Sequence, residues 1–116
     1  MYINLEEYEF FLVCGKTDMR GGVYTLSRRV QDELNMDPLE KKIFIFCGSN
    51  NKSIKALLWD RNGFIMIQKR LLSKGTFRWP KDEKDAIKVS RNDVIMLLKG
   101  ADIFRKFPSL NGQLIV

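Results

Sequence analysis

A β-hairpin is predicted by residues 54–70, IKALLWDRNGFIMIQKR. Two runs rich in apolar and aromatic residues flank Asn62-Gly63, and this dipeptide favours a type I′ turn because both central residues of that turn need φ > 0. With Asn62 and Gly63 as the loop, the strands pair by counting outward from the turn. The predicted pairs are Arg61 with Phe64, Asp60 with Ile65, Trp59 with Met66, Leu58 with Ile67, and Lys55 with Arg70.

The predicted pairing gives the hairpin two different faces, because opposed residues share a face of the sheet. One face is apolar and is the predicted core face: Ile54, Ala56, Leu58, Ile65, Ile67 and Leu71, with Asp60 near the turn and Lys69 further along. The other face mixes aromatic residues with cations: Trp59, Arg61, Phe64 and Met66, then Leu57 and Gln68, then Lys55 and Arg70. This second face is the first candidate for a functional surface.

The elements around the hairpin predict an α+β fold, a mainly antiparallel sheet with one amphipathic helix packed on it and a short C-terminal helix. The five strands are expected at 9–14, 42–47, 54–60, 64–70 and 76–79. Apolar residues at helical spacing place the long helix at about 20–34, with Asp18 or Thr17 as its cap. A capping box, Ser90-Arg91-Asn92-Asp93, starts the short helix at about 91–99.

The chain of 116 residues is expected to form a single domain, 1–116, with a C-terminal arm at 103–116 that has no clear period. Its N-terminus is acidic and lacks the order of a signal peptide, and no apolar run approaches the length of a membrane span. We therefore expect a cytoplasmic protein without a membrane partner.

Several kinds of chemistry are disfavoured by residues that are missing. The sequence has no histidine, which removes the commonest general base and the commonest metal ligand. Its two cysteines, Cys14 and Cys47, stand alone in their segments and are expected to be small buried hydrophobes. Asp18, Asp60 and Asp93 each have a simpler role as a cap or hairpin-end residue. We therefore expect no catalytic residue, no metal site, no cofactor and no enzymatic activity, with a metal-dependent nuclease as a minor alternative.

The positive charge is concentrated around the hairpin. The net charge is +6, yet residues 41–80 hold nine Lys and Arg residues against Asp60 alone. Such a surface is expected to meet phosphate groups, although a solvated basic face that only aids solubility would have the same composition.

A set of motifs in a fixed order spans about residues 10–105. They are Thr17-Asp18-Met19-Arg20-Gly21-Gly22, Ile54-Lys55, Leu58-Trp59-Asp60, Gly63-Phe64, Lys69-Arg70-Leu71, Gly75, Phe77, Trp79-Pro80 and Leu97-Leu98-Lys99-Gly100-Ala101-Asp102. In order and spacing they resemble the TnpB-type accessory protein of bacterial insertion sequence sixty-six elements, which is not the RNA-guided nuclease of the same name. The resemblance implies a small protein that is encoded beside a transposase and needed for efficient transposition.

Two hypotheses follow for the molecular role. The first is an accessory protein that binds DNA, mostly without sequence preference, through a basic face made of Arg20, Lys52, Lys55, Lys69, Arg70, Lys74 and Arg78. The alternative is an adaptor that docks on the transposase through Trp59, Phe64 and Met66, in which case direct DNA contact is not needed. Either role is compatible with a homo-oligomer. In a third, purely structural interpretation, the aromatic residues only cover the second face of the sheet.

Overall fold

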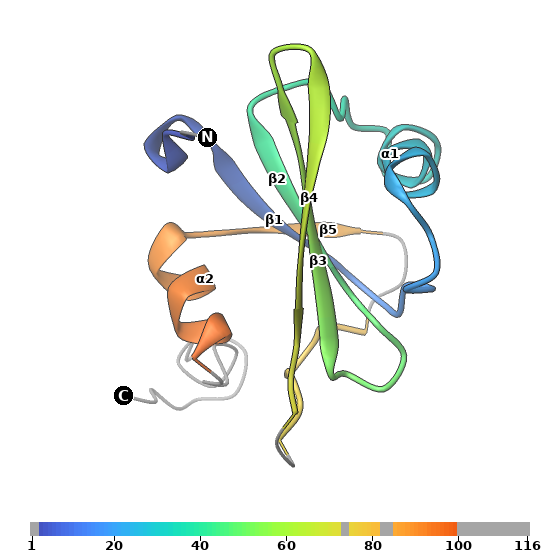
Figure 1. Cartoon of the computed structure of the whole chain (residues 1–116), viewed down its shortest axis with the longest axis vertical. Coiled ribbons are helices and arrows are strands. Elements are labelled where there is room, and N and C mark those ends of the chain that lie inside the picture. Colours follow the sequence, from blue (N-terminus) through green and yellow to red (C-terminus); the bar gives the residue numbers. More distant parts are fainter. Residues whose placement is uncertain (1–2, 73–74, 82–84, 100–116) are drawn as a thin grey trace.

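A computed structural model describes residues 3–72, 75–81 and 85–99, which form one five-stranded sheet with helices on both sides (Figure 1). The sheet order is β4-β3-β2-β1-β5; β1 and β2 are parallel, and the other neighbours are antiparallel. The predicted α+β class is thus confirmed. The elements are η1 (Leu5–Glu7), β1 (Glu9–Val13), α1 (Val23–Asp32), β2 (Lys42–Cys47), β3 (Ser53–Asp60), β4 (Gly63–Arg70), β5 (Ala86–Val89) and α2 (Arg91–Leu98).

The two faces of the sheet are covered by different helices (Figure 1). Strands β1 and β2 are parallel, so a crossover must connect them, and α1 is that crossover. It packs its buried residues Leu26 and Val30 against one cluster of apolar side chains, which includes Phe44 and Phe46. The opposite cluster contains residues of α2 and the alternate side chains of β1 and β2: Phe10, Leu12, Ile43 and Ile45, with Val94 and Leu97 of the helix. Both faces of β2 are therefore covered.

The hairpin forms, but its predicted register is wrong. Arg61 and Asn62 make the turn, and Asp60 pairs with Gly63. Arg61 takes a left-handed conformation with φ of 55°, and the Asn62 N–H donates to the Asp60 carbonyl at 2.5 Å. Arginine rarely adopts this conformation, so the sequence carries no signal for it. The pairing slips by one residue on each strand, so alternation still assigns the residues to the predicted faces. Trp59 departs from this pattern, because it packs on the cluster opposite to that of Phe64 and Met66.

The predicted strand at 76–79 is also wrong. This segment lies in a loop, and the fifth strand is β5, which pairs antiparallel with β1. The alternating pattern that predicted a strand reflects two aromatic residues, Phe77 and Trp79, that fix this loop to the rest of the protein. Phe77 is buried and its N–H donates to the Asn51 carbonyl at 2.6 Å, while the indole N–H of Trp79 donates to the Val13 carbonyl at 2.8 Å.

The two helices differ in how well their starts were predicted. Helix α2 has the predicted capping box, in which Ser90 and Asp93 exchange side-chain and backbone hydrogen bonds. Helix α1 starts later than predicted, because its N-cap is Gly22 rather than Asp18 or Thr17.

The predicted arm at 103–116 lies outside the described residues. Within the described part of the chain, neither the length nor the apolarity of any helix would allow it to cross a membrane.

Candidate functional site

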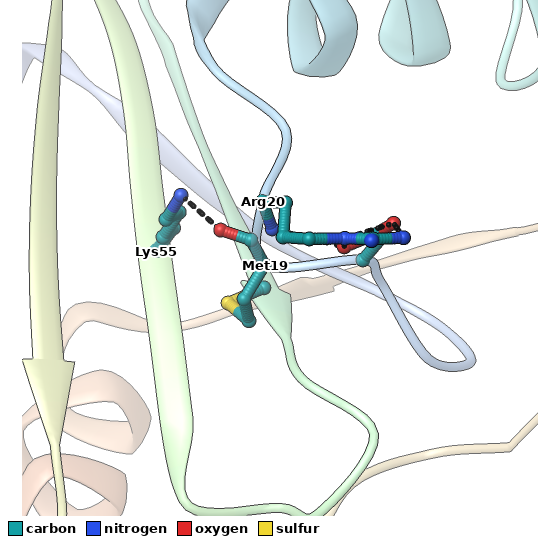
Figure 2. Close-up of polar contacts among 4 residues, drawn as sticks. Met19, Arg20 and Lys55 are labelled. Atoms are coloured by element: carbon teal, nitrogen blue, oxygen red, sulfur yellow. Dashed lines mark hydrogen bonds and ion pairs between the residues drawn. The ribbon is translucent and has the colours of Figure 1, made fainter.

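The loop of residues 17–22 follows β1 and is held in place by Lys55 of β3 (Figure 2). The Lys55 residue is only 9% exposed, and its ammonium donates to the carbonyls of Met19 at 2.6 Å and Gly21 at 3.0 Å. A buried cation is tolerated when its protons are hydrogen-bonded, so Lys55 and the loop depend on each other. Lys55 was predicted to lie on an exposed basic face that binds DNA. Its burial shows that this prediction is wrong for Lys55.

The start of the same loop is fixed to β2 and to α1. The Thr17 N–H donates to the Cys47 carbonyl at 2.8 Å, and Thr17 forms an isolated parallel bridge with Gly48. From α1, the Arg29 guanidinium donates to the Thr17 hydroxyl and to the Cys14 carbonyl. The Arg29 side chain is only 18% exposed, because these acceptors lie beneath α1.

Close packing between the loop and the end of β2 requires a glycine at position 48. A Cβ atom added at Gly48 would lie 2.7 Å from Cγ of Met19. Carbon atoms that are not bonded to each other pack at about 3.5–4.0 Å. The absence of a side chain at Gly48 therefore lets the Met19 side chain lie against β2.

The supported loop presents Arg20 to solvent. Its side chain is 91% exposed and forms an ion pair with Asp18 at 2.7 Å (Figure 2). Hydrogen bonds from the Arg20 side chain and then from the Arg20 backbone N–H lower the pKa of Asp18 to about 2. The same pair raises the pKa of Arg20. Asp18 therefore stays ionised across the physiological range and orients the guanidinium.

Arg20 lines a polar hollow of about 550 Å³ between the loop, the β2–β3 turn and the end of β4. We call this hollow the basic groove. Three cations reach it from two separate segments: Lys16 and Arg20 from the loop region and Arg70 from β4. Asp18 is the acidic residue among them. The lining consists of Lys16, Thr17, Asp18, Met19, Arg20, Ser49, Asn50, Ser53, Gln68 and Arg70.

The other predicted DNA contacts lie elsewhere. Lys69 is on the opposite face of the sheet, where its ammonium donates to the Leu98 carbonyl at the end of α2. Lys52 donates from the β2–β3 turn to the Gly75 carbonyl at 3.1 Å, and Arg78 is exposed on the loop at 75–81. Lys74 lies outside the described residues. Of the predicted DNA contacts, Arg20 and Arg70 thus lie together in the groove. The groove also includes Lys16, which was not predicted. Its position directly before the Thr17–Gly22 motif is the feature of the sequence that could have indicated it.

The predicted docking residues Trp59, Phe64 and Met66 are half-buried. The rings of Trp59 and Phe64 contact each other edge to face, with centroids 5.0 Å apart. Phe64 and Met66 pack on the cluster beneath α1, while Trp59 packs on the opposite cluster. These contacts match the structural reading in which the aromatic residues cover the sheet.

Both cysteines are buried, as predicted, and carry free thiols. Burial raises the pKa of the Cys47 thiol to about 11. Within residues 3–72, 75–81 and 85–99, no group of three or more Cys, Asp and Glu side chains is arranged to hold a metal ion.

Comparison with known proteins gives the family. The model of the IS66 Orf2 like protein family matches residues 8–107. The chain belongs to the IS66 Orf2-like family. A relative from Sinorhizobium fredii, described as uncharacterized protein y4hO, is 37% identical over 92 residues, which cover 79% of each chain. No solved structure matches. The resemblance found in the motifs is confirmed, and family membership connects the protein to transposition of an IS66 element.

Proposed function

We propose that this IS66 Orf2-like protein is a non-catalytic accessory factor that binds DNA through the basic groove during transposition. The observation that carries the proposal is the convergence of Lys16 and Arg20, from the loop region, with Arg70 of β4 on one hollow. The loop is held by Lys55 and Arg29, so the cations have a fixed support. A fixed cluster of cations is suited to the phosphate backbone, where charge and spacing matter more than base identity.

The chemistry of the groove is suited to phosphate. Guanidinium groups donate in a planar fork that matches two phosphate oxygens. Amide and hydroxyl groups of Ser49, Asn50 and Gln68 can donate to further phosphate or sugar oxygens. The groove lies between a loop and a strand, and no helix of the described chain lines it, so we propose binding without base readout.

The non-catalytic part of the proposal is supported by the structural roles of two aspartates. Asp18 orients Arg20, and Asp93 caps α2. A two-metal nuclease needs carboxylates that converge on the ions. Incubation of supercoiled plasmid with the protein and Mg²⁺ or Mn²⁺ tests this part, and specific cleavage would contradict it.

The DNA proposal is tested by fluorescence anisotropy with a labelled duplex over a series of salt concentrations. Replacement of both Arg20 and Arg70 by Gln removes two phosphate contacts, so the slope of log K against log salt should become shallower by about 1.8. The matched control replaces Arg61 and Lys88, exposed cations outside the groove, by Gln and removes the same charge. Equal affinities for the two double variants would overturn the groove as the DNA site.

The adaptor alternative makes a different prediction. Capture of the transposase in the presence of a nuclease, with no measurable binding of the purified protein to duplex DNA, would replace our proposal by the adaptor role. If the protein acts on DNA, we expect capture of the transposase to depend on DNA or to occur alongside direct binding of the duplex.

A further inference from the structure

Strand β4 forms one edge of the sheet and leaves a row of backbone groups facing outward. The Leu71 N–H donates to the Lys52 carbonyl at 2.7 Å, and this bond fixes which residues of β4 bond to β3. Hydrogen-bonded pairs alternate along an antiparallel ladder, so the odd-numbered residues of β4 face β3. Four residues of β4 therefore direct their N–H and C=O groups away from β3, toward the open edge of the sheet: Phe64, Met66, Gln68 and Arg70. Among the described residues, no other segment binds these groups.

We propose that this edge pairs with the same edge of a second copy of the chain, antiparallel and about a two-fold axis at Ile67. This register is centred on the four outward-facing residues and uses all of their backbone groups. Phe64 of one copy then pairs with Arg70 of the other, and Met66 pairs with Gln68. The pairing would join two five-stranded sheets into one.

The side chains of β4 explain why a second copy fits. Its first five residues, GFIMI, carry no charge, while Lys69 and Arg70 close the strand. Antiparallel pairing places the cationic end of one copy beside the neutral end of the other, with Lys69 opposite Ile65. A parallel arrangement in register would instead place Lys69 beside Lys69, and like charges across a ladder are destabilising.

Ile67 gives the edge an apolar centre. This residue is 56% exposed although it lies in the middle of a strand. In the proposed register the two copies of Ile67 form a pair without hydrogen bonds between them, and side chains in such pairs lie closest together. Each copy would cover apolar surface that the other leaves in water.

The two-fold axis would be perpendicular to the sheet, so both copies keep α1 on the same side. The basic grooves, which include Gln68 and Arg70 on that side, would also lie on one face. The dimer would thus offer two groups of cations to one DNA molecule. The pairing itself does not rest on DNA binding and is tested without DNA.

The sharpest test uses Ile67→Cys. The native Cys14 and Cys47 are 0% and 1% exposed, so the introduced thiol is the accessible one. With oxidised glutathione, the introduced thiols of two copies should form an intermolecular disulfide while the glutathione disulfide is reduced to two glutathione molecules. The matched control is Ile87→Cys, which places an exposed thiol on the short edge strand β5. We expect covalent dimer from Ile67→Cys and little from Ile87→Cys; equal yields would overturn the proposal.

A second measurement follows association without a cross-link. Gln68→Pro removes an outward N–H without removing a bond to β3, whereas Gln68→Ala keeps that N–H. Sedimentation at increasing concentration should show a dimer for the wild type and for Gln68→Ala. For Gln68→Pro the dissociation constant should rise about thirtyfold, because the dimer loses two hydrogen bonds, one from each copy. Equal dimerisation of the two variants, or a wild type that stays monomeric throughout the series, would refute the pairing.

Discussion

Replacement of Lys55 by Met should destabilise the protein far more than replacement of an exposed lysine. The change keeps most of the apolar stem but removes the two hydrogen bonds to the Met19 and Gly21 carbonyls, at 2.6 and 3.0 Å. A hydrogen bond to a charged group contributes about 1.5–3 kcal/mol. Removal of a buried charge offsets part of this loss, and so does access of water to Met19 and Gly21, which are only half-buried. We expect the free energy of unfolding to fall by about 2 kcal/mol.

Urea denaturation followed by circular dichroism measures this loss, provided that the slope with denaturant is unchanged. The matched control is Lys88→Met in β5, which removes an exposed lysine paired with Glu9 at 2.5 Å. An exposed pair of this kind contributes about 0–1 kcal/mol. If Lys55→Met were no more destabilising than Lys88→Met, Lys55 would not be the support of the loop.

Three further predictions concern the same end of the molecule. Gly48→Ala should cost about 1–3 kcal/mol in urea melts, and Met19→Ala in the same chain should recover part of it, because the added Cβ would lie 2.7 Å from Met19. An NMR titration of the Asp18 carboxyl group should give a midpoint near 2, which moves up to the ordinary range in Arg20→Gln. Since this folded pKa is below the unfolded value of 3.8, the pair stabilises the fold fully above pH 3.8 and its contribution is lost as the pH falls through 2. The Cys47 thiol, with its pKa raised to about 11, should resist alkylation at pH 8 until urea unfolds the chain.

Features with a local cause could be predicted from the sequence. The capping box at Ser90 and Asp93 needs four consecutive residues, and it forms as predicted. The long helix was predicted from the helical spacing of its apolar residues, and two residues of that stripe, Leu26 and Val30, are buried in the core. The motif at 17–22 was also visible, because its residue order resembles that of a known family.

Features that depend on distant partners could not be predicted in the same way. Lys55 stands on a strand whose alternation correctly gives its face, but its burial depends on a loop more than thirty residues earlier in the chain. Trp79 is explained by its bond to the Val13 carbonyl, not by the strand that its alternation predicted. The turn at Arg61 adopts a backbone conformation for which the residue type gives no signal.

An NMR titration of the isotope-labelled wild-type protein with a short DNA duplex tests the central claim most directly. If the basic groove binds DNA, the backbone amide shifts that change should lie at Lys16 to Arg20, at Ser49 and Asn50, and at Gln68 and Arg70. The changes should disappear as salt is raised, because the contacts are to phosphate groups. Shift changes confined to α2 and the end of the hairpin at Arg61, with the groove unchanged, would contradict the account.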